Sequence, residues 1–116
     1  MKRTLLIALL AAVPVTADVT GNWKVDGSIG QFPVDLVCSL KESGNKLTGA
    51  CKGGDIGELP VTGETEGSAV RWSYQVNFQG MPFTIVYNGT LDSATAMKGN
   101  ISIMENPSGS FAAKKQ

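Results

Sequence analysis

The chain contains no histidine, and beyond residue 17 it has neither a long apolar run nor a segment with helical periodicity. Without histidine it lacks the commonest general base and the usual partner of a nucleophilic serine or cysteine. It also lacks the commonest metal ligand, and it has no Cys-x-x-Cys pair to replace it. We therefore expect a protein that is not an enzyme and that holds neither metal nor cofactor.

The first seventeen residues have the pattern of a secretory signal peptide. A basic start, Met1-Lys2-Arg3, precedes the apolar residues 4–13 and the small-residue cleavage site Val15-Thr16-Ala17. The apolar run is shorter than the roughly 20 residues that a membrane-spanning helix needs. The pattern predicts cleavage after Ala17, one domain over residues 18–116, no membrane span, and a secreted or periplasmic location; a retained N-terminal helix is the alternative.

Charge of either sign is scarce. The chain has ten basic and ten acidic side chains, and cleavage removes Lys2 and Arg3, which leaves eight against ten and a net charge of −2. Domains that bind nucleic acid concentrate lysine and arginine on one face. We therefore expect no nucleic-acid partner.

There are only two cysteines, Cys38 and Cys51. An even number of cysteines in an exported chain predicts a disulfide. A domain of this size buries a modest core, so a cross-link worth about 2–4 kcal/mol is a useful stabiliser. A structural role is favoured over a redox or metal-binding role.

What the chain does have is alternation of apolar and polar residues. Two apolar series illustrate it: Val34, Leu36, Cys38, Leu40, and then Val70, Trp72, Tyr74, Val76, Phe78. This period of two predicts strands with one buried face, and turn signals divide residues 18–116 into eight of them. We expect an all-β fold, an eight-stranded antiparallel up-and-down β-barrel with one disulfide. Closure removes the exposed edges that the alternative, a meander sandwich, would leave.

Five glycines share the apolar parity of their strands: Gly21, Gly49, Gly63, Gly89 and Gly99. A glycine inside a strand costs stability and needs a reason. Ideal hairpins built on the turn signals pair Cys38 with Cys51 and Gly89 with Gly99. They also pair Phe78 with Phe83, Tyr74 with Tyr87, and Trp72 with Gly89 and Val61. We therefore expect the Trp72 indole to cover Gly89 and Gly99.

At the head of the first expected strand, Gly21-Asn22-Trp23 resembles the Gly-x-Trp signature of the calycins, the superfamily of lipocalins and avidins. The resemblance implies that Trp23 closes one end of a barrel, beneath a basic residue of the last strand, here Lys114 or Lys115. With its short length and its final strand, residues 109–114, the chain is most similar to small exported bacterial calycin-like proteins. That group implies a fold and no particular activity.

The resemblance also implies that a ligand would lie inside the barrel, whose interior either fills with side chains or holds one small molecule. We expect all eight aromatic side chains to point inward: Trp23, Phe32, Trp72, Tyr74, Phe78, Phe83, Tyr87 and Phe111. So many rings favour a filled interior, whereas the glycines favour spare room, and both states stay open. A bound ligand would contact Trp23, Trp72, Tyr74, Phe83 and Tyr87, oriented by the tyrosine hydroxyls.

The function expected from the sequence is a secreted or periplasmic, non-enzymatic barrel that binds a small apolar ligand. The alternatives are a protein-binding module, such as a periplasmic protease inhibitor, and a structural accessory barrel of the cell envelope. Loops 28–33 and 79–82 are the candidate contacts for a protein partner. Asp55, Glu58, Glu64 and Glu66 are close in sequence, so a hydrolytic pair or a calcium site is a further alternative to a solvated face.

Overall fold

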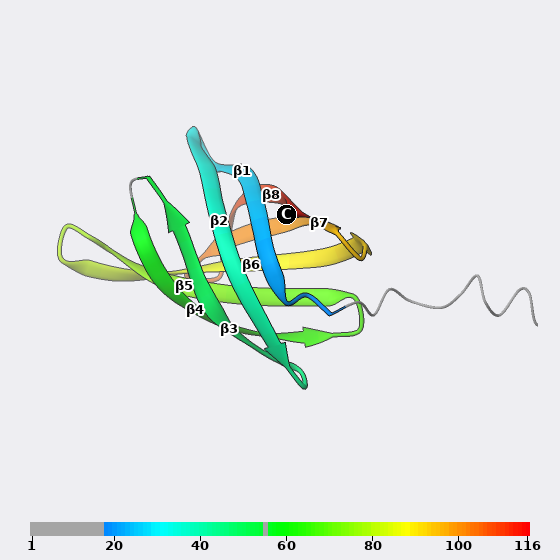
Figure 1. Ribbon diagram of the computed structural model, residues 1–116. Coiled ribbons are helices and arrows are strands. Elements are labelled where there is room, and N and C mark those ends of the chain that lie inside the picture. Colours follow the sequence, from blue (N-terminus) through cyan, green and yellow to red (C-terminus); the bar gives the residue numbers. More distant parts are fainter. Residues whose placement is uncertain (1–17, 55) are drawn as a thin grey trace, which may run out of the picture.

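The computed structural model describes residues 18–54 and 56–116; the expected signal peptide, residues 1–17, lies outside the described residues. Eight strands follow one another: β1 (Gly21–Ile29), β2 (Phe32–Ser43), β3 (Lys46–Gly53), β4 (Gly57–Glu66), β5 (Ala69–Phe78), β6 (Met81–Ser93), β7 (Ala96–Ile103) and β8 (Asn106–Lys115). Each strand pairs antiparallel with the next, and β8 pairs with β1, so the sheet closes into an up-and-down barrel (Figure 1). The predicted fold class and the Cys38–Cys51 disulfide are confirmed.

The alternation in the sequence produces the barrel interior. Along β5, Val70, Trp72 and Tyr74 are buried, whereas Arg71 and Gln75 between and beyond them are exposed. The same alternation of inward apolar and outward polar residues is found in the other strands, and the inward apolar side chains form one cluster. Within the described residues no helix is long and apolar enough to cross a membrane.

The two ends of the barrel differ. The β1–β2, β3–β4, β5–β6 and β7–β8 hairpins turn at one end, which we call the mouth, and the other hairpins turn at the opposite end, near the C-terminus (Figure 1). At that opposite end Trp23 is fully buried, and its indole Nε1 donates to the Val19 carbonyl over 2.8 Å. The Lys115 ammonium lies 5.6 Å from the Trp23 ring centroid and donates to the Asp18 carbonyl. Lys115, rather than Lys114, therefore covers Trp23, and this end is closed.

Two of the predicted registers are correct and those of the β5–β6 hairpin are wrong. Cys38 faces Cys51, and Gly89 faces Gly99, as predicted. In the β5–β6 hairpin Phe78 faces Met81, Tyr74 faces Ile85 and Trp72 faces Tyr87. The turn holds only Gln79 and Gly80, with φ of 55° and 82°, instead of the four residues expected. Because the error is an even number of residues, every side chain keeps its predicted face.

The expected neighbours of Trp72 also change. Trp72 faces Gly63 instead of Val61, because the β4–β5 turn is centred one residue later than expected. A Cβ on Gly63 would lie 1.9 Å from the Arg71 carbonyl oxygen, so the glycine allows the two strands to approach closely. Gly89 is covered by the Phe111 ring, whose Cζ would lie 3.0 Å from an added Cβ. Aromatic cover of a strand glycine is present, but Phe111 supplies it at Gly89.

The expectation that all eight aromatic rings point inward is wrong for two of them. Phe32 and Phe78 are 76% and 62% exposed. Both have the inward parity of their strands, but they lie next to the turns of the β1–β2 and β5–β6 hairpins. Parity directs a side chain into the core only where opposite walls of the barrel face each other, and the hairpin tips extend past that region.

The wall of the barrel is incomplete on one side of the mouth. Strands β4 and β5 pair only between residues 62–66 and residues 69–73. Among the described residues, none pairs with residues 57–61 of β4 or residues 74–78 of β5 on the side where these strands face each other. In Figure 1 the β5–β6 hairpin extends to the left, away from the β3–β4 hairpin. We call this region the β4–β5 split.

Candidate ligand site at the barrel mouth

A pocket of about 350 Å³ lies in the mouth of the barrel. Three parts of the chain enclose this mouth pocket: the β1–β2 hairpin, the end of the β3–β4 hairpin, and the β5–β6 hairpin. Its lining residues are Ile29, Phe32, Pro33, Val34, Asp35, Leu36, Gly53, Gly54, Ile56, Tyr74, Val76 and Ile85. Small-molecule sites occupy about 300–1,000 Å³, so this pocket has room for one small ligand or for one or two side chains.

The walls of the mouth pocket are mainly aliphatic, and Asp35 is the one charged residue among the described residues that line it. Asp35 lies at the exposed rim, where its carboxylate and that of Asp26 both accept hydrogen bonds from the Lys24 ammonium. These bonds raise the pKa of Lys24, because they stabilise its charged form. These carboxylates have the outward parity of β1 and β2, so the inward wall of the pocket is mainly apolar in the described part of the chain.

Tyr74 lies at the inner end of the pocket. Its hydroxyl oxygen is 2.7 Å from that of Tyr87, and the two residues are 6% and 0% exposed. Burial raises the pKa of both hydroxyls, so both are neutral near pH 7 and one donates to the other. When Tyr87 donates, the Tyr74 proton is free to bond to a polar atom of a ligand.

Below Tyr74 the interior is filled by stacked rings. Trp72 and Tyr87 lie parallel, with centroids 5.1 Å apart and planes 3° apart, and Phe111 contacts both edge-on. Parallel and edge-on contacts are the favourable arrangements of aromatic pairs. The Trp72 Nε1 is buried without a hydrogen-bond partner in the described part of the chain. A filled interior and a small pocket therefore coexist at different depths of the same barrel.

The five residues predicted to bind a ligand are not in one place. Tyr74 lines the mouth pocket, Trp72 and Tyr87 belong to the ring stack, and Trp23 lies at the closed end. Phe83 is half-buried on β6, with its ring centroid 6.5 Å from that of the exposed Phe78. A role of these residues in ligand binding stays a prediction.

The site predicted from the sequence contains only aromatic residues and leaves out the aliphatic lining of the mouth pocket, although the sequence carries a signal for this lining. Val34, Val76 and Ile85 all have the inward parity of strands that run to the mouth. The pocket is lined mainly by apolar residues close to the mouth-end turns, whereas Trp72 and Tyr87 lie deeper in the barrel.

Exposed apolar side chains surround the mouth. Among the described residues the large exposed hydrophobic ones are Phe32, Phe78, Met81 (61%) and Met104 (58%). All four lie at the tips of mouth-end hairpins: β1–β2, β5–β6 and β7–β8. The sequence predicted two of these loops, 28–33 and 79–82, as contact surfaces, and Met104 adds a third.

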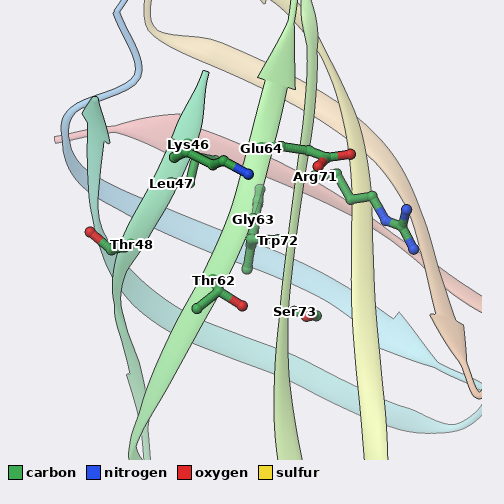
Figure 2. Close-up of a pocket in the computed structure, with 9 residues that line it drawn as sticks. All are labelled: Lys46, Leu47, Thr48, Thr62, Gly63, Glu64, Arg71, Trp72 and Ser73. Carbon is green, nitrogen blue, oxygen red and sulfur yellow. The ribbon is translucent and has the colours of Figure 1, made fainter. Parts of the chain in front are cut away.

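A second hollow, of about 510 Å³, lies on the outer surface across β3, β4 and β5 (Figure 2). Lys46, Glu64 and Arg71 are cross-strand neighbours around it. These charged side chains are exposed to solvent. The hollow is an open depression on the outer face of the sheet.

The acidic cluster expected from the sequence does not form a metal site in the described residues, where no group of three or more histidine, cysteine, aspartate or glutamate side chains comes together. Glu58 faces Lys52, and Glu64 faces Lys46, so two of its members lie opposite basic residues on β3. Asp55 lies outside the described residues.

Comparisons of the chain with protein-family models, with curated proteins and with solved structures find no match.

Proposed function

We propose that the protein is a secreted or periplasmic, non-enzymatic barrel that binds a small apolar ligand in the mouth pocket. The pocket itself carries this proposal, because its lining is mainly aliphatic and includes Tyr74, whose hydroxyl is hydrogen-bonded to that of Tyr87. Apolar ligand surface removed from water there contributes about 25 cal/mol per Å². The hydroxyl orients a ligand that has one polar atom.

Two features support the wider setting of this proposal. Trp23 beneath Lys115, in a closed eight-stranded barrel, supports the resemblance to small exported calycin-like proteins. The Cys38–Cys51 disulfide supports an oxidising compartment outside the cytoplasm.

Titration with N-phenyl-1-naphthylamine, a neutral apolar dye that fluoresces when it leaves water, tests the proposal. We expect saturable, blue-shifted fluorescence with the oxidised protein. Val76→Phe fills part of the pocket and is expected to weaken dye binding at least tenfold. The matched control is Val37→Phe, which adds the same ring to a half-buried valine of outward parity on β2.

Equal dye binding by the two valine variants, or no saturable fluorescence with the wild-type protein, contradicts the proposal. Near-ultraviolet circular dichroism of each variant shows that the barrel has folded.

A second candidate function, binding of a protein partner through the hairpin tips, is favoured by the four exposed apolar side chains at the mouth. Clustered apolar side chains on a surface mark interaction sites. Phe78→Ser with Met81→Ser removes two of them without changing a residue that lines the mouth pocket. If the protein acts by binding a partner through the hairpin tips, this double variant is expected to lose the partner while it keeps dye binding. If the protein is only a small-molecule carrier, the double variant is expected to keep its full function.

A further inference from the structure

We propose that the free edge of β5 at the β4–β5 split takes an extended peptide of a partner protein as an added strand, with apolar side chains of the peptide entering the mouth pocket. The inference rests on the proposed function to the extent that it uses the same pocket. The partner proposed here is a polypeptide segment in an extended, strand conformation.

The hydrogen bonds of the neighbouring strands establish which backbone groups of β5 point toward the split. The Met104 N–H donates to the Thr84 carbonyl over 3.2 Å, so the backbone groups of Thr84 face β7. Gln75 lies directly opposite Thr84 in the β5–β6 ladder. In an antiparallel pair that is not hydrogen-bonded, both residues direct their N–H and C=O groups away from each other. The backbone groups of Gln75, and by alternation those of Asn77, therefore face the split.

The β4 side of the split is different. The Thr65 N–H donates to the Asn45 carbonyl over 3.0 Å. The backbone N–H and C=O groups of the odd-numbered residues of β4 therefore point toward β3, and those of the even-numbered residues point toward the split. Pro60 is one of these, and proline has no N–H to donate. Proline on an edge strand prevents the addition of another strand. The split thus has a blunted edge on β4 and an open edge on β5.

The mouth pocket lies on the inner face of this open edge. Tyr74 and Val76, on either side of Gln75, both line the pocket. Residues that lie opposite each other on paired strands project on the same face of the sheet. A peptide strand paired with β5 therefore directs every second side chain toward the pocket. Main-chain hydrogen bonds with adjacent side-chain pockets are the mark of recognition by strand addition.

The charge around the split indicates the composition of the peptide. Glu58 is exposed on the β4 edge of the split, opposite Lys52 on β3, and among the described residues no basic side chain lines the pocket. An extended peptide with alternating apolar residues and an outward basic residue is complementary to this surface.

The test titrates the oxidised, ¹⁵N-labelled protein with the peptide acetyl-Thr-Ile-Lys-Ile-Thr-amide and follows backbone amides by NMR. We expect the amides of Gln75 and Asn77 to shift and to exchange with solvent at least tenfold more slowly. Two N-methylated peptides give the sharper result. Pairing antiparallel to β5 predicts that methylation of the lysine and threonine amides abolishes binding, whereas methylation of the isoleucine amides, which face Pro60, is tolerated.

The protein side is tested with Gln75→Pro, which removes the edge N–H, and with Gln75→Ala, which keeps it. We expect the proline variant to lose the peptide, the alanine variant to bind it within about twofold, and both to keep dye binding. Because Gln75 does not bond to β6 through its backbone, the hairpin keeps its ladder. Near-ultraviolet circular dichroism checks that both variants are folded.

The outcomes separate this inference from the proposed function. Dye binding with no peptide binding up to millimolar concentration, or equal binding of both methylated peptides, overturns strand addition and leaves the carrier proposal standing. Peptide binding without dye binding overturns the carrier proposal alone. Self-association of the protein that Gln75→Pro abolishes identifies a second copy as the occupant and overturns the peptide proposal.

Discussion

The hydroxyl oxygens of Tyr74 and Tyr87 lie 2.7 Å apart, and this pair connects the packed interior of the barrel to its mouth. The Tyr87 ring belongs to the stack with Trp72, whereas Tyr74 lines the mouth pocket. Among the described residues Tyr87 has no other hydrogen-bond partner for its hydroxyl. One hydrogen bond therefore satisfies a fully buried polar group, and the same bond orients the polar group of the candidate site.

Tyr74→Phe and Tyr87→Phe are expected to have unequal costs. The first leaves the fully buried Tyr87 hydroxyl without a partner, which costs about 1–3 kcal/mol. The second leaves unpaired the hydroxyl of Tyr74, which is 6% exposed and lines the pocket, and we expect a smaller cost of about 0.5–1.5 kcal/mol. Removal of both hydroxyls is expected to be nearly neutral. Urea unfolding of the four proteins measures this double-mutant cycle, and simple additivity would show that the hydroxyls do not depend on each other.

Stability is expected to fall at alkaline pH. Burial raises the pKa of both tyrosines above the value of 10.0 that they have when unfolded. Below about pH 10 both states keep these protons; above it the unfolded chain loses them and the folded protein keeps them. The free energy of unfolding then decreases by up to about 1.4 kcal/mol per pH unit for each group.

The double variant Tyr74→Phe with Tyr87→Phe is the control for this pH dependence. Lys24 also has a raised pKa and contributes to an alkaline decline, but it does so equally in both proteins. Urea unfolding at about pH 9 and about pH 11 is expected to show a smaller loss in the variant. Identical losses would mean that the tyrosines ionise in the folded barrel as they do in water.

The two tryptophans give a matched comparison. Both are fully buried, but the Trp23 Nε1 donates to the Val19 carbonyl and the Trp72 Nε1 has no partner among the described residues. Phenylalanine removes the same volume at each site. We expect Trp23→Phe to lower the free energy of unfolding by about 1–2 kcal/mol more than Trp72→Phe, because it also leaves a buried carbonyl unpaired. A larger cost at Trp72 would contradict this account of the closed end.

The disulfide is expected to be a stabiliser. Cys38 and Cys51 lie opposite each other on β2 and β3 and close a short loop. Replacing both by alanine is expected to lower the free energy of unfolding by about 2–4 kcal/mol. A reducing agent should destabilise the wild-type protein by a similar amount and leave the double variant unchanged. Wild-type stability that is insensitive to reduction would assign the cysteines another role.

Much of the fold was predictable because one local rule repeats through the chain. Period-two alternation assigns faces without knowledge of the exact turns, which is why Trp72, Tyr74 and Tyr87 are correctly inside even though their predicted partners are wrong. Registers depend on turn length, and the residues from Gln79 to Pro82 fit either a two-residue or a four-residue loop. The structure has the shorter turn, which also extends the hairpin past the core and exposes Phe78.

The candidate site was harder to predict for a physical reason. Tyr74 and Val76 of the mouth pocket lie on β5 where β4 and β5 have separated beyond Thr62 and Ser73, and separation of two strands depends on the curvature of the whole barrel. Alternation in the sequence is the same for paired and unpaired strands. Pro60 carries the one local signal, since proline in a strand indicates an edge, and it identifies the β4 side of the split.

Native mass spectrometry of the oxidised protein, purified from its own exported fraction, tests the central claim most directly. We predict a mass above that of the bare disulfide-bonded chain, an excess that disappears on denaturation and is absent when Val76→Phe is purified in the same way. A bare mass for the wild-type protein, or the same excess in the Val76→Phe variant, would contradict a small-molecule site in the mouth pocket.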